Sequence, residues 1–245
     1  MKKLLTNCVL CSGILLYSCS NIPTKGLVAH YTFKGGNAND KSGNNNHGTT
    51  STVSFTSDRF GVANESVLFD SENDFVKVTN PSFLNSDKGT LVAWVKFDKV
   101  DHVQYVASAG DEGSTENYIS FLRLDPARHT LGIYQRGPHE ANWIDGTTII
   151  GENAYYHLVM LSNGTEWSIY VNGVKEKLSI RAGDNTGKWI RQLNSIDNFV
   201  IGSSKLLAPY TIPYLSGNID EILLYDRPLT DKEIEELYMT TKPNN

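Results

Sequence analysis

The sequence is poor in cysteine, with three residues of this type in 245, all of them within the first 19 positions. The rest of the chain therefore has no disulfide framework, and its stability must come from packing. Cys8 and Cys11 have the Cys-x-x-Cys spacing of redox and metal motifs. They lie inside an apolar leader without a flanking folded segment, and we interpret them as part of that leader.

The chain also lacks an apolar run long enough to span a bilayer as a helix, and it has no excess of basic residues. Lys and Arg number 22 against 27 Asp and Glu, for a net charge of −5. A mildly acidic chain has no general attraction for polyanions, which argues against nucleic acid as a partner. With 40% hydrophobic and 20% charged residues, the composition excludes a disordered chain or a collagen.

The first residues have the features of a secretory signal. A basic start, Met1–Lys3, precedes a mostly apolar run, Leu4–Tyr17. The small Ser18 then precedes Cys19, an arrangement that resembles the lipobox of bacterial lipoproteins, in which the cysteine receives a diacylglycerol. The resemblance implies a signal peptide over residues 1–18 and a lipidated tether over 19–25. It also implies membrane contact only through the lipid on Cys19, in the bacterial cell envelope at the outer membrane, with the facing side open.

From Gly26 onward, short alternating apolar and polar runs are separated by turn residues, which predicts about a dozen strands. Asn172-Gly173 indicates a tight hairpin, and the capping box from Thr230 to Glu233 begins a short C-terminal helix. No linker or repeat interrupts the pattern, so we expect one all-β domain over residues 26–245. The expected strands are 27–33, 53–55, 66–69, 75–78, 90–97, 104–108, 118–124, 131–135, 155–161, 166–171, 174–180, 199–201 and 219–225.

Several motifs along this region occur in a characteristic order. They include Leu27–Asn44 with its Gly-Asn-Ala-Asn-Asp-Lys-Ser-Gly loop, Arg59-Phe60-Gly61, Ala93-Trp94-Val95, Tyr156-His157-Leu158-Val159 and Gly217–Ile222. Together they resemble bacterial laminin-G-like, concanavalin A-like lectin/glucanase domains. The resemblance implies a two-sheet antiparallel jelly-roll sandwich with its first and last strands adjacent.

Two aromatic residues within these motifs are expected to be structural. Trp94 has apolar neighbours on a strand, so a core position is favoured over stacking on a ligand. His157 is expected to be half-buried and hydrogen-bonded rather than catalytic.

A calcium site is a further hypothesis, because members of this fold superfamily often bind one structural calcium ion. Asn, Asp and Gly loops supply the oxygen ligands that calcium takes, and Asn37, Asp40 and Gly43 lie on such a loop. The resemblance places the first strand near the last, so Asp220 could complete the site. The alternative is a turn in which these side chains bond their own backbone.

Glycosidase chemistry is not expected. Retaining hydrolysis needs two closely spaced carboxylates, and the glucanases of this fold resemble Glu-x-Asp-x-x-Glu on one strand. Here Glu72-Asn73-Asp74 is followed by Lys77, and Asp220 lacks the flanking glutamates at the required spacing. A lyase would need a Tyr or His base with a cation, and no lyase signature is visible. The sequence therefore favours a protein that is not an enzyme.

Two stretches do not read as strands, Arg136–Gly151 and Arg181–Asp197, and long connections in a sandwich are more often functional than idle. Each carries a Trp beside polar side chains, the combination that binds a sugar's apolar face and hydroxyls. The alternative is that both rings pack onto the sandwich. The candidate ligand-binding residues are His139, Trp143 and Asp145 in the first stretch and Trp189 and Arg191 in the second.

These features predict a lipid-anchored, non-catalytic carbohydrate-binding domain. Its expected partner is a glycan or polysaccharide, with polysaccharide-degrading enzymes as neighbours in the same task. A structural or adhesive module that binds protein through the same loops is the alternative, and a glycoside hydrolase or polysaccharide lyase on the same fold comes after it.

Overall fold

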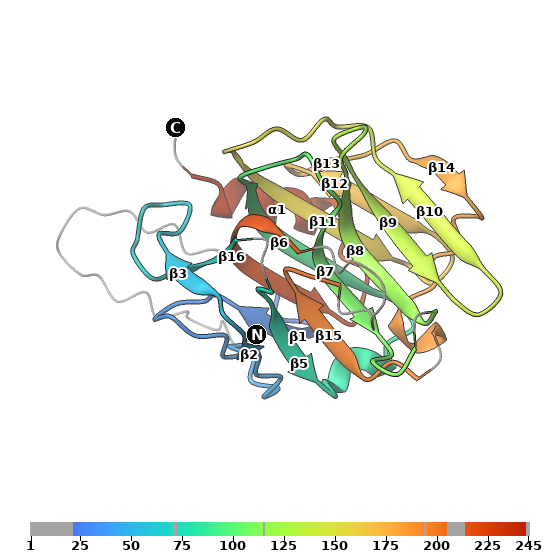
Figure 1. The fold of residues 1–245 in the computed structure, drawn as a ribbon, viewed down its shortest axis with the longest axis horizontal. Helices are drawn as coiled ribbons and strands as arrows, with labels where there is room; N and C mark the ends of the chain where they lie inside the picture. The colour runs from blue at the N-terminus through green and yellow to red at the C-terminus, as the bar shows by residue number, and fades with distance from the viewer. Residues whose placement is uncertain (1–21, 71–72, 115, 194, 205–213, 244–245) are drawn as a thin grey trace, which may run out of the picture.

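Two antiparallel sheets packed face to face make up the structure, a computed structural model that describes residues 22–70, 73–114, 116–193, 195–204 and 214–243. Cys19 and the predicted leader lie outside these residues. Figure 1 shows the two layers one over the other. Both sheets have eight strands. The predicted two-sheet antiparallel sandwich is confirmed, with more strands than the dozen expected.

The first sheet has the order β13-β12-β11-β6-β16-β4-β3, and β1 pairs with β16 as an additional strand. The pairing of β1 with β16 confirms that the first and last strands are adjacent. The strands are β1 (Leu27–Tyr31), β3 (Ser54–Thr56), β4 (Ser66–Asp70), β6 (Gly89–Phe97), β11 (Tyr155–Ser162), β12 (Trp167–Val171), β13 (Val174–Lys175) and β16 (Ser216–Tyr225).

The second sheet has the order β14-β10-β9-β8-β7-β15-β5-β2. Its strands are β2 (Thr49–Thr50), β5 (Val76–Thr79), β7 (Gln104–Gly110), β8 (Tyr118–Asp125), β9 (Thr130–Arg136), β10 (Ala141–Asp145), β14 (Ser179–Ala182) and β15 (Asn198–Ile201). Two short 3-10 helices, η1 (Ser82–Asn85) and η2 (Ile190–Gln192), contact each other.

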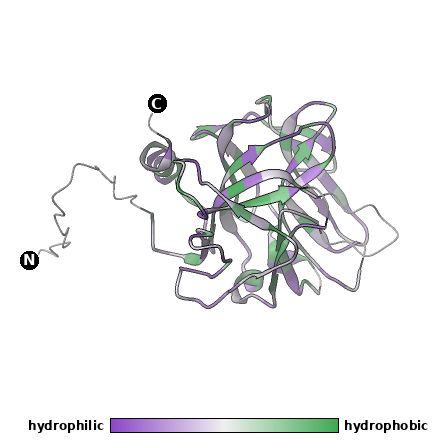
Figure 2. Ribbon diagram, turned by 60° about the vertical axis from the view of Figure 1, so that its left-hand side comes forward, coloured by the Kyte–Doolittle hydropathy of each residue, from purple (hydrophilic) through white to green (hydrophobic). Residues whose placement is uncertain are grey.

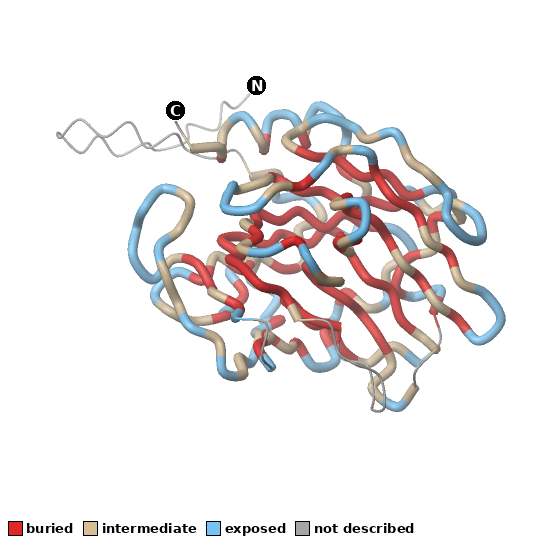
Figure 3. The backbone as a smooth tube through the Cα atoms, turned by 45° about the horizontal axis from the view of Figure 1, so that its top comes forward, coloured by how far each residue is buried: buried red, intermediate tan, exposed pale blue. Residues whose placement is uncertain are grey.

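The main hydrophobic core fills the space between the sheets, where alternate residues of the facing strands meet. Figure 3 shows this as buried strands enclosed by exposed loops. Leu91, Ala93, Val95 and Phe97 of β6 follow the period of two that a strand imposes. Alternation of this kind leaves the intervening residues on the outer faces, which is where the two sheets differ.

A single helix, α1 (Asp231–Thr241), covers the outer face of the first sheet (Figure 2). The predicted capping box is confirmed, because Thr230 and Glu233 satisfy each other's backbone N–H groups. Ile234 and Leu237 pack against a second apolar cluster that includes Val92 and Val159. Among the described residues this is the one α-helix, and none is long and apolar enough to cross a membrane. The outer face of the second sheet therefore has no helix over it in the described part of the chain.

The strands expected from the sequence correspond to observed ones, apart from β2, β10 and the split of 174–180. The Asn172-Gly173 hairpin is confirmed, with both residues at positive φ as a type I′ turn requires. The prediction that 136–151 has no strand is wrong, because it contains β10. That strand pairs with β14, which extends into the second stretch, so the sheet joins the two regions.

A buried ionic cluster lies on the outer face of the first sheet, beside α1. The guanidinium of Arg59 donates to Asp220 at 2.6 Å and to Glu221 at 3.2 Å, and Glu221 also pairs with His30 at 2.7 Å. A register shift in β16 between Ile219 and Glu221 turns both acids toward Arg59. The Arg59 side chain also donates to the carbonyl of Thr241, so the cluster joins β1, β16 and the helix end.

Trp94 and His157 adjoin this cluster. Trp94 is buried as predicted, and its Nε1 donates to Thr241 Oγ1 at 2.9 Å. The prediction for His157 is wrong on both counts. The residue is 1% exposed, and neither ring nitrogen has a hydrogen-bond partner among the described residues. The ring instead contacts those of Trp94 and Tyr238, which also stack on each other. Burial lowers the pKa of His157 to about 3, which keeps it neutral.

Candidate ligand-binding site

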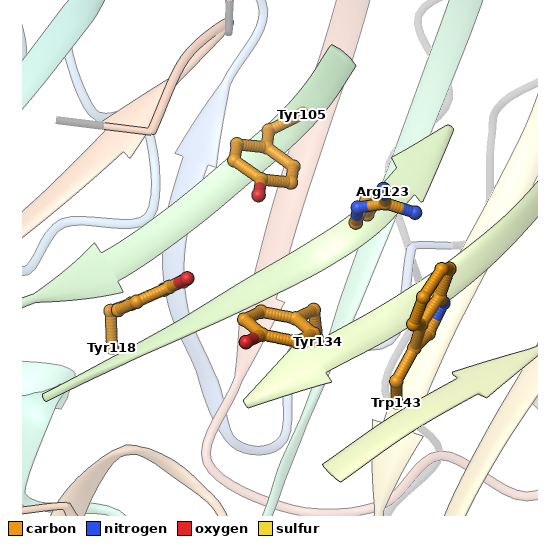
Figure 4. Close-up of a pocket in the computed structure, with 5 residues that line it drawn as sticks. All are labelled: Tyr105, Tyr118, Arg123, Tyr134 and Trp143. Atoms are coloured by element: carbon orange, nitrogen blue, oxygen red, sulfur yellow. The ribbon is translucent and has the colours of Figure 1, made fainter. Parts of the chain in front are cut away.

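An open pocket of about 210 Å³ lies on the outer face of the second sheet. Four adjacent strands supply its lining, and Figure 4 shows the side chains gathered on one side of these strands. In each strand a neighbour of the lining residue points into the core, as Val106, Ile133 and Ile144 do. The lining residues are Tyr105 from β7, Tyr118 and Arg123 from β8, Tyr134 from β9 and Trp143 from β10.

A bulge in β8 places Arg123 in this pocket. The register between β8 and β9 shifts between Ser120 and Arg123, and Leu122 has φ of 57°. Phe121 and Leu122 consequently both enter the core, although consecutive strand residues normally face opposite sides. The extra residue resets the alternation and turns Arg123 to the same face as Tyr118.

Three aromatic rings form a continuous wall. Tyr118 and Tyr134 have ring centroids 5.7 Å apart, and Trp143 meets Tyr134 edge to face at 6.5 Å. Tyr134 and Trp143 are directly opposite in the register of β9 and β10 and remain half-buried. Rings that are held by the sheet and still partly accessible can receive the apolar face of a ligand.

Arg123 carries the one formal charge among the lining residues. Its Cζ lies 4.7 Å from the centre of the Trp143 ring, within cation–π range. Among the described residues, none of its nitrogens has a carboxylate oxygen within 4.0 Å, and the buried Nη1 has no hydrogen-bond partner. The nearby Asp125 is paired with Arg128 at 2.6 Å instead. The pocket thus holds a cation with free hydrogen-bonding capacity.

The hydroxyls of Tyr105 and Tyr118 in the pocket are neutral near physiological pH. Burial raises the pKa of Tyr118 far above its ordinary value, and the neighbouring tyrosines add to the rise. Burial also raises the pKa of Tyr105, although Arg123 acts in the opposite direction. A protonated hydroxyl both donates and accepts, so these groups suit hydroxyl-bearing or anionic ligands.

Asp145 holds Trp143 in place. Its carboxylate is buried and accepts from Trp143 Nε1 at 2.7 Å and from Arg181 Nε at 3.0 Å. Gly132 lies beneath it, and a Cβ at that position would stand 2.4 Å from Asp145 Oδ1. Asp145 therefore positions the indole ring rather than offering its oxygens to a ligand.

The structure separates the five predicted ligand-binding residues. Trp143 and Asp145 share one face of β10, and His139 is exposed in the adjacent turn between β9 and β10. Trp189 is 1% exposed and packs on Phe121 in the core, so the expectation that it stacks on a ligand is corrected. Arg191 is exposed on η2, where it pairs with Asp87 and not with the pocket residues.

Sequence reasoning missed four of the pocket residues, Tyr105, Tyr118, Arg123 and Tyr134. All four lie on strands that the sequence predicts, and each has at least one apolar neighbour in the sequence. A tyrosine on the outward side of a strand is a weak indication of a surface platform. Tyr105, Tyr118 and Tyr134 each carry this signal. Arg123 gave no such indication, because strict alternation from Tyr118 would place it in the core.

The residues proposed for calcium do not fit a calcium site. The Asp40 carboxylate accepts from the backbone N–H groups of His30, Ser42 and Asn46 and from the Ser42 hydroxyl. Asn37 bonds its own loop, and Asp220 is paired with Arg59. Over the described ranges no group of three or more His, Cys, Asp or Glu side chains could hold a metal ion. These contacts favour the alternative of a hydrogen-bonded turn.

Comparison with known proteins relates the fold to sugar-binding and sugar-cleaving families. Residues 70–235 match the family model described as the Concanavalin A-like lectin/glucanases superfamily. No significant sequence match was found among curated proteins.

Three solved structures illustrate the structural similarity. Domain 4 of AbnA, a GH43 extracellular arabinanase from Geobacillus stearothermophilus solved with arabinotriose, has a TM-score of 0.66 at 19% identity, covering 86% of this chain and 98% of that one. The Ruminococcus gnavus IT-sialidase CBM40 bound to alpha2,3 sialyllactose has a TM-score of 0.57 at 15% identity, covering 71% and 97%. Trypanosoma rangeli sialidase has a TM-score of 0.63 at 22% identity, covering 89% of this chain and 33% of that one. At such identities the similarity shows the fold.

Proposed function

We propose that this chain, which belongs to the concanavalin A-like lectin/glucanases superfamily, binds carbohydrate in the pocket of the second sheet and does not cut it. The observation that carries the proposal is the wall of three rings beside a charged donor and neutral hydroxyls. A sugar presents C–H faces and hydroxyls, so it needs an aromatic platform next to directional polar groups. The pocket supplies both within one surface.

The composition of the pocket supports binding rather than hydrolysis. Glycosidases of the usual kind need two carboxyl groups on either side of the scissile bond, and none of the five lining residues is acidic. Lyase chemistry would need a deprotonated base, whereas the raised pKa values keep Tyr105 and Tyr118 protonated. The chemistry available at this site is recognition.

The structural neighbours point in the same direction. An arabinanase domain solved with arabinotriose and a sialidase CBM40 bound to sialyllactose share the sandwich. Both are separate domains of about this size, since this chain covers nearly all of each. Both were solved with an oligosaccharide bound, which supports carbohydrate binding for this chain.

A glycan array followed by calorimetry on the purified protein tests the proposal. We expect saturable binding to at least one oligosaccharide, together with no reducing ends and no unsaturated uronates after prolonged incubation. Product release from any bound polysaccharide would show an enzyme instead. Absence of binding across neutral and acidic glycans would refute the proposed function.

We also propose that Cys19 carries the lipid that anchors the domain to the cell envelope. The support is the position of this cysteine directly after Ser18 at the end of the apolar leader. Mass spectrometry of the membrane-extracted protein should show acyl mass on Cys19 as the first residue. An unmodified amino terminus at another position would exclude the anchor while leaving the glycan site untouched.

A further inference from the structure

We infer that the pocket recognises the anionic group of an acidic sugar, a carboxylate or a sulfate ester, through the guanidinium of Arg123. This inference rests on the proposed function and adds the chemical class of the ligand. It starts from the buried Nη1 of Arg123, which has no hydrogen-bond partner among the described residues. An unpartnered buried donor is costly unless something pairs with it, and in a ligand pocket the ligand is the natural partner.

The carboxylates around the pocket form ion pairs with arginines other than Arg123. Each neighbouring carboxylate has its own arginine, with Asp125 paired to Arg128 at 2.6 Å and Asp145 to Arg181 at 3.0 Å. Glu116 lies 3.5 Å from Arg136 in the same way. Among the described residues, Arg123 has no such pair within 4.0 Å and interacts with Asp125 only at longer range, so an incoming anion would meet a cation with no direct ion-pair partner.

The surroundings of Arg123 fit the oxygens of a carboxylate or a sulfate ester. Figure 4 shows the guanidinium between Tyr105 and Trp143, above Tyr134. Stacking near the Trp143 ring at 4.7 Å leaves the edge of the guanidinium, with its N–H groups, for hydrogen bonds to a ligand. The protonated hydroxyl of Tyr105, which lies beside Arg123 (Figure 4), can donate to the same oxygens. Charge-assisted bonds of this kind are stronger than neutral ones.

The backbone adopts an uncommon conformation to present this side chain. Leu122 at φ of 57° lies in the left-handed region, which non-glycine residues seldom adopt. Residues in such strained backbone conformations persist only where the surrounding structure stabilises them, and they are frequent at ligand-binding sites. The bulge gives the core both Phe121 and Leu122 and gives the pocket Arg123.

The size of the pocket limits how much of the sugar enters it. Its volume of about 210 Å³ is below the roughly 300–1,000 Å³ of pockets that enclose drug-sized ligands. We therefore expect one acidic ring to occupy the pocket while the rest of the oligosaccharide lies along the open face of the sheet.

Pairs of ligands that differ only in charge test the inference without changing the protein. Calorimetry compares oligogalacturonides with their carboxyl-reduced forms, and sulfated galactan oligosaccharides with their desulfated forms. We expect the charged member of at least one pair to bind about 10–100-fold more tightly, which is the range for hydrogen bonds to a charged group. The pair that shows the difference identifies carboxylate or sulfate as the anion.

Variants then assign the effect to Arg123. Arg123→Gln should remove the preference for the charged ligand and leave affinity for the neutral member within about threefold, because the rings remain. Arg123→Lys, which keeps the charge without the planar fork, should fall between the two. The matched control is Arg191→Gln, which makes the same change in net charge at an exposed residue and should leave both affinities unchanged.

The outcomes separate this inference from the proposed function. Tight binding of a neutral glycan with no preference in either charged pair overturns the acidic ligand and leaves carbohydrate binding in place. Equal loss in Arg123→Gln and Arg191→Gln also overturns it, since that shows general electrostatic attraction. If no glycan of either charge binds, the proposed function fails and this inference fails with it.

Discussion

Replacing Trp143 by alanine should weaken glycan binding about ten- to a hundredfold while lowering the free energy of unfolding by only about 1 kcal/mol. The loss in affinity corresponds to losing the apolar contact between the indole ring and the ligand, which contributes about 1–3 kcal/mol to binding. Stability changes little because the ring lies on the outer face of β10 and is half-buried, outside the main core. Calorimetric titration and chemical unfolding measure the two effects separately.

Trp189 is the matched control, since the same substitution there should give the opposite result. Its ring is 1% exposed and meets Phe121 at 5.1 Å inside the core. Trp189→Ala should cost about 3–5 kcal/mol of stability, as large-to-small core substitutions do. At a temperature where that variant is still folded, its affinity should match that of the parent.

If Trp143→Ala instead binds glycan with the affinity of the parent protein, the pocket is not the binding site.

Replacing Arg59 by methionine should destabilise the protein by about 3–5 kcal/mol at neutral pH, the cost of leaving buried charges without their partner. The Arg59 and Asp220 side chains are each 6% exposed, so water cannot take over the lost contacts. Arg191→Met is the control, because it breaks an exposed pair with Asp87 that should contribute less than about 1 kcal/mol. Urea unfolding of both variants beside the parent makes the comparison.

The pH dependence of the Arg59 variant tests whether charge, rather than packing, is responsible. Burial already raises the pKa of Asp220 to about 6, with Arg59 opposing the rise. Burial acts in the same direction on Glu221, but His30 and Arg59 outweigh it and lower that pKa. Without Arg59 both carboxyls should bind protons more readily in the folded state than in the unfolded state. The deficit of the variant relative to the parent should therefore shrink as pH falls from 7 toward about 5. A deficit independent of pH would point to lost packing alone.

The sequence motifs that carry the family resemblance meet in space, which explains why the fold could be predicted well. His30, Arg59 and Glu221 belong to three separate motifs and join in one buried ionic cluster beside Trp94. These residues fix the pairing of the first and last strands and the seating of α1. Motifs of this kind predict the fold, because their residues hold the sheets and the helix together.

The candidate ligand site is harder to predict because it depends on register. The sequence offers Trp143 as a candidate but places it on a loop, and β10 becomes a strand only through its pairing with β9 and β14. The other residues that line the pocket lie 9 to 38 positions before Trp143 in the chain. No local sequence pattern specifies how their strands pair with one another. The bulge at Leu122 adds a shift of one residue, which is enough to move Arg123 from one face to the other.

The error over Trp189 has a related origin. The Gly and Asp residues around Trp189 in the sequence suggest an exposed loop, and only the tertiary structure shows that its ring is buried next to Gly89. A Cβ at position 89 would stand 2.6 Å from Trp189 Nε1, so the indole fits there because Gly89 has no side chain. Complementarity between residues 100 positions apart is not visible in either local sequence.

The amino-terminal segment and the aromatic pocket lie on opposite sides of the sandwich. Ile22 and Leu27 pack against the apolar cluster under α1, and the carbonyl of Lys25 accepts from Arg227 at 2.8 Å. The chain thus enters the sandwich on the side of the first sheet, whereas the aromatic wall is on the far side of the second. A surface that holds the protein by its amino terminus would have the helix side nearest to it and the aromatic pocket turned outward. Many copies on one such surface would present their pockets to the same medium, where a long polysaccharide can engage several at once and dissociate slowly even if each contact is weak.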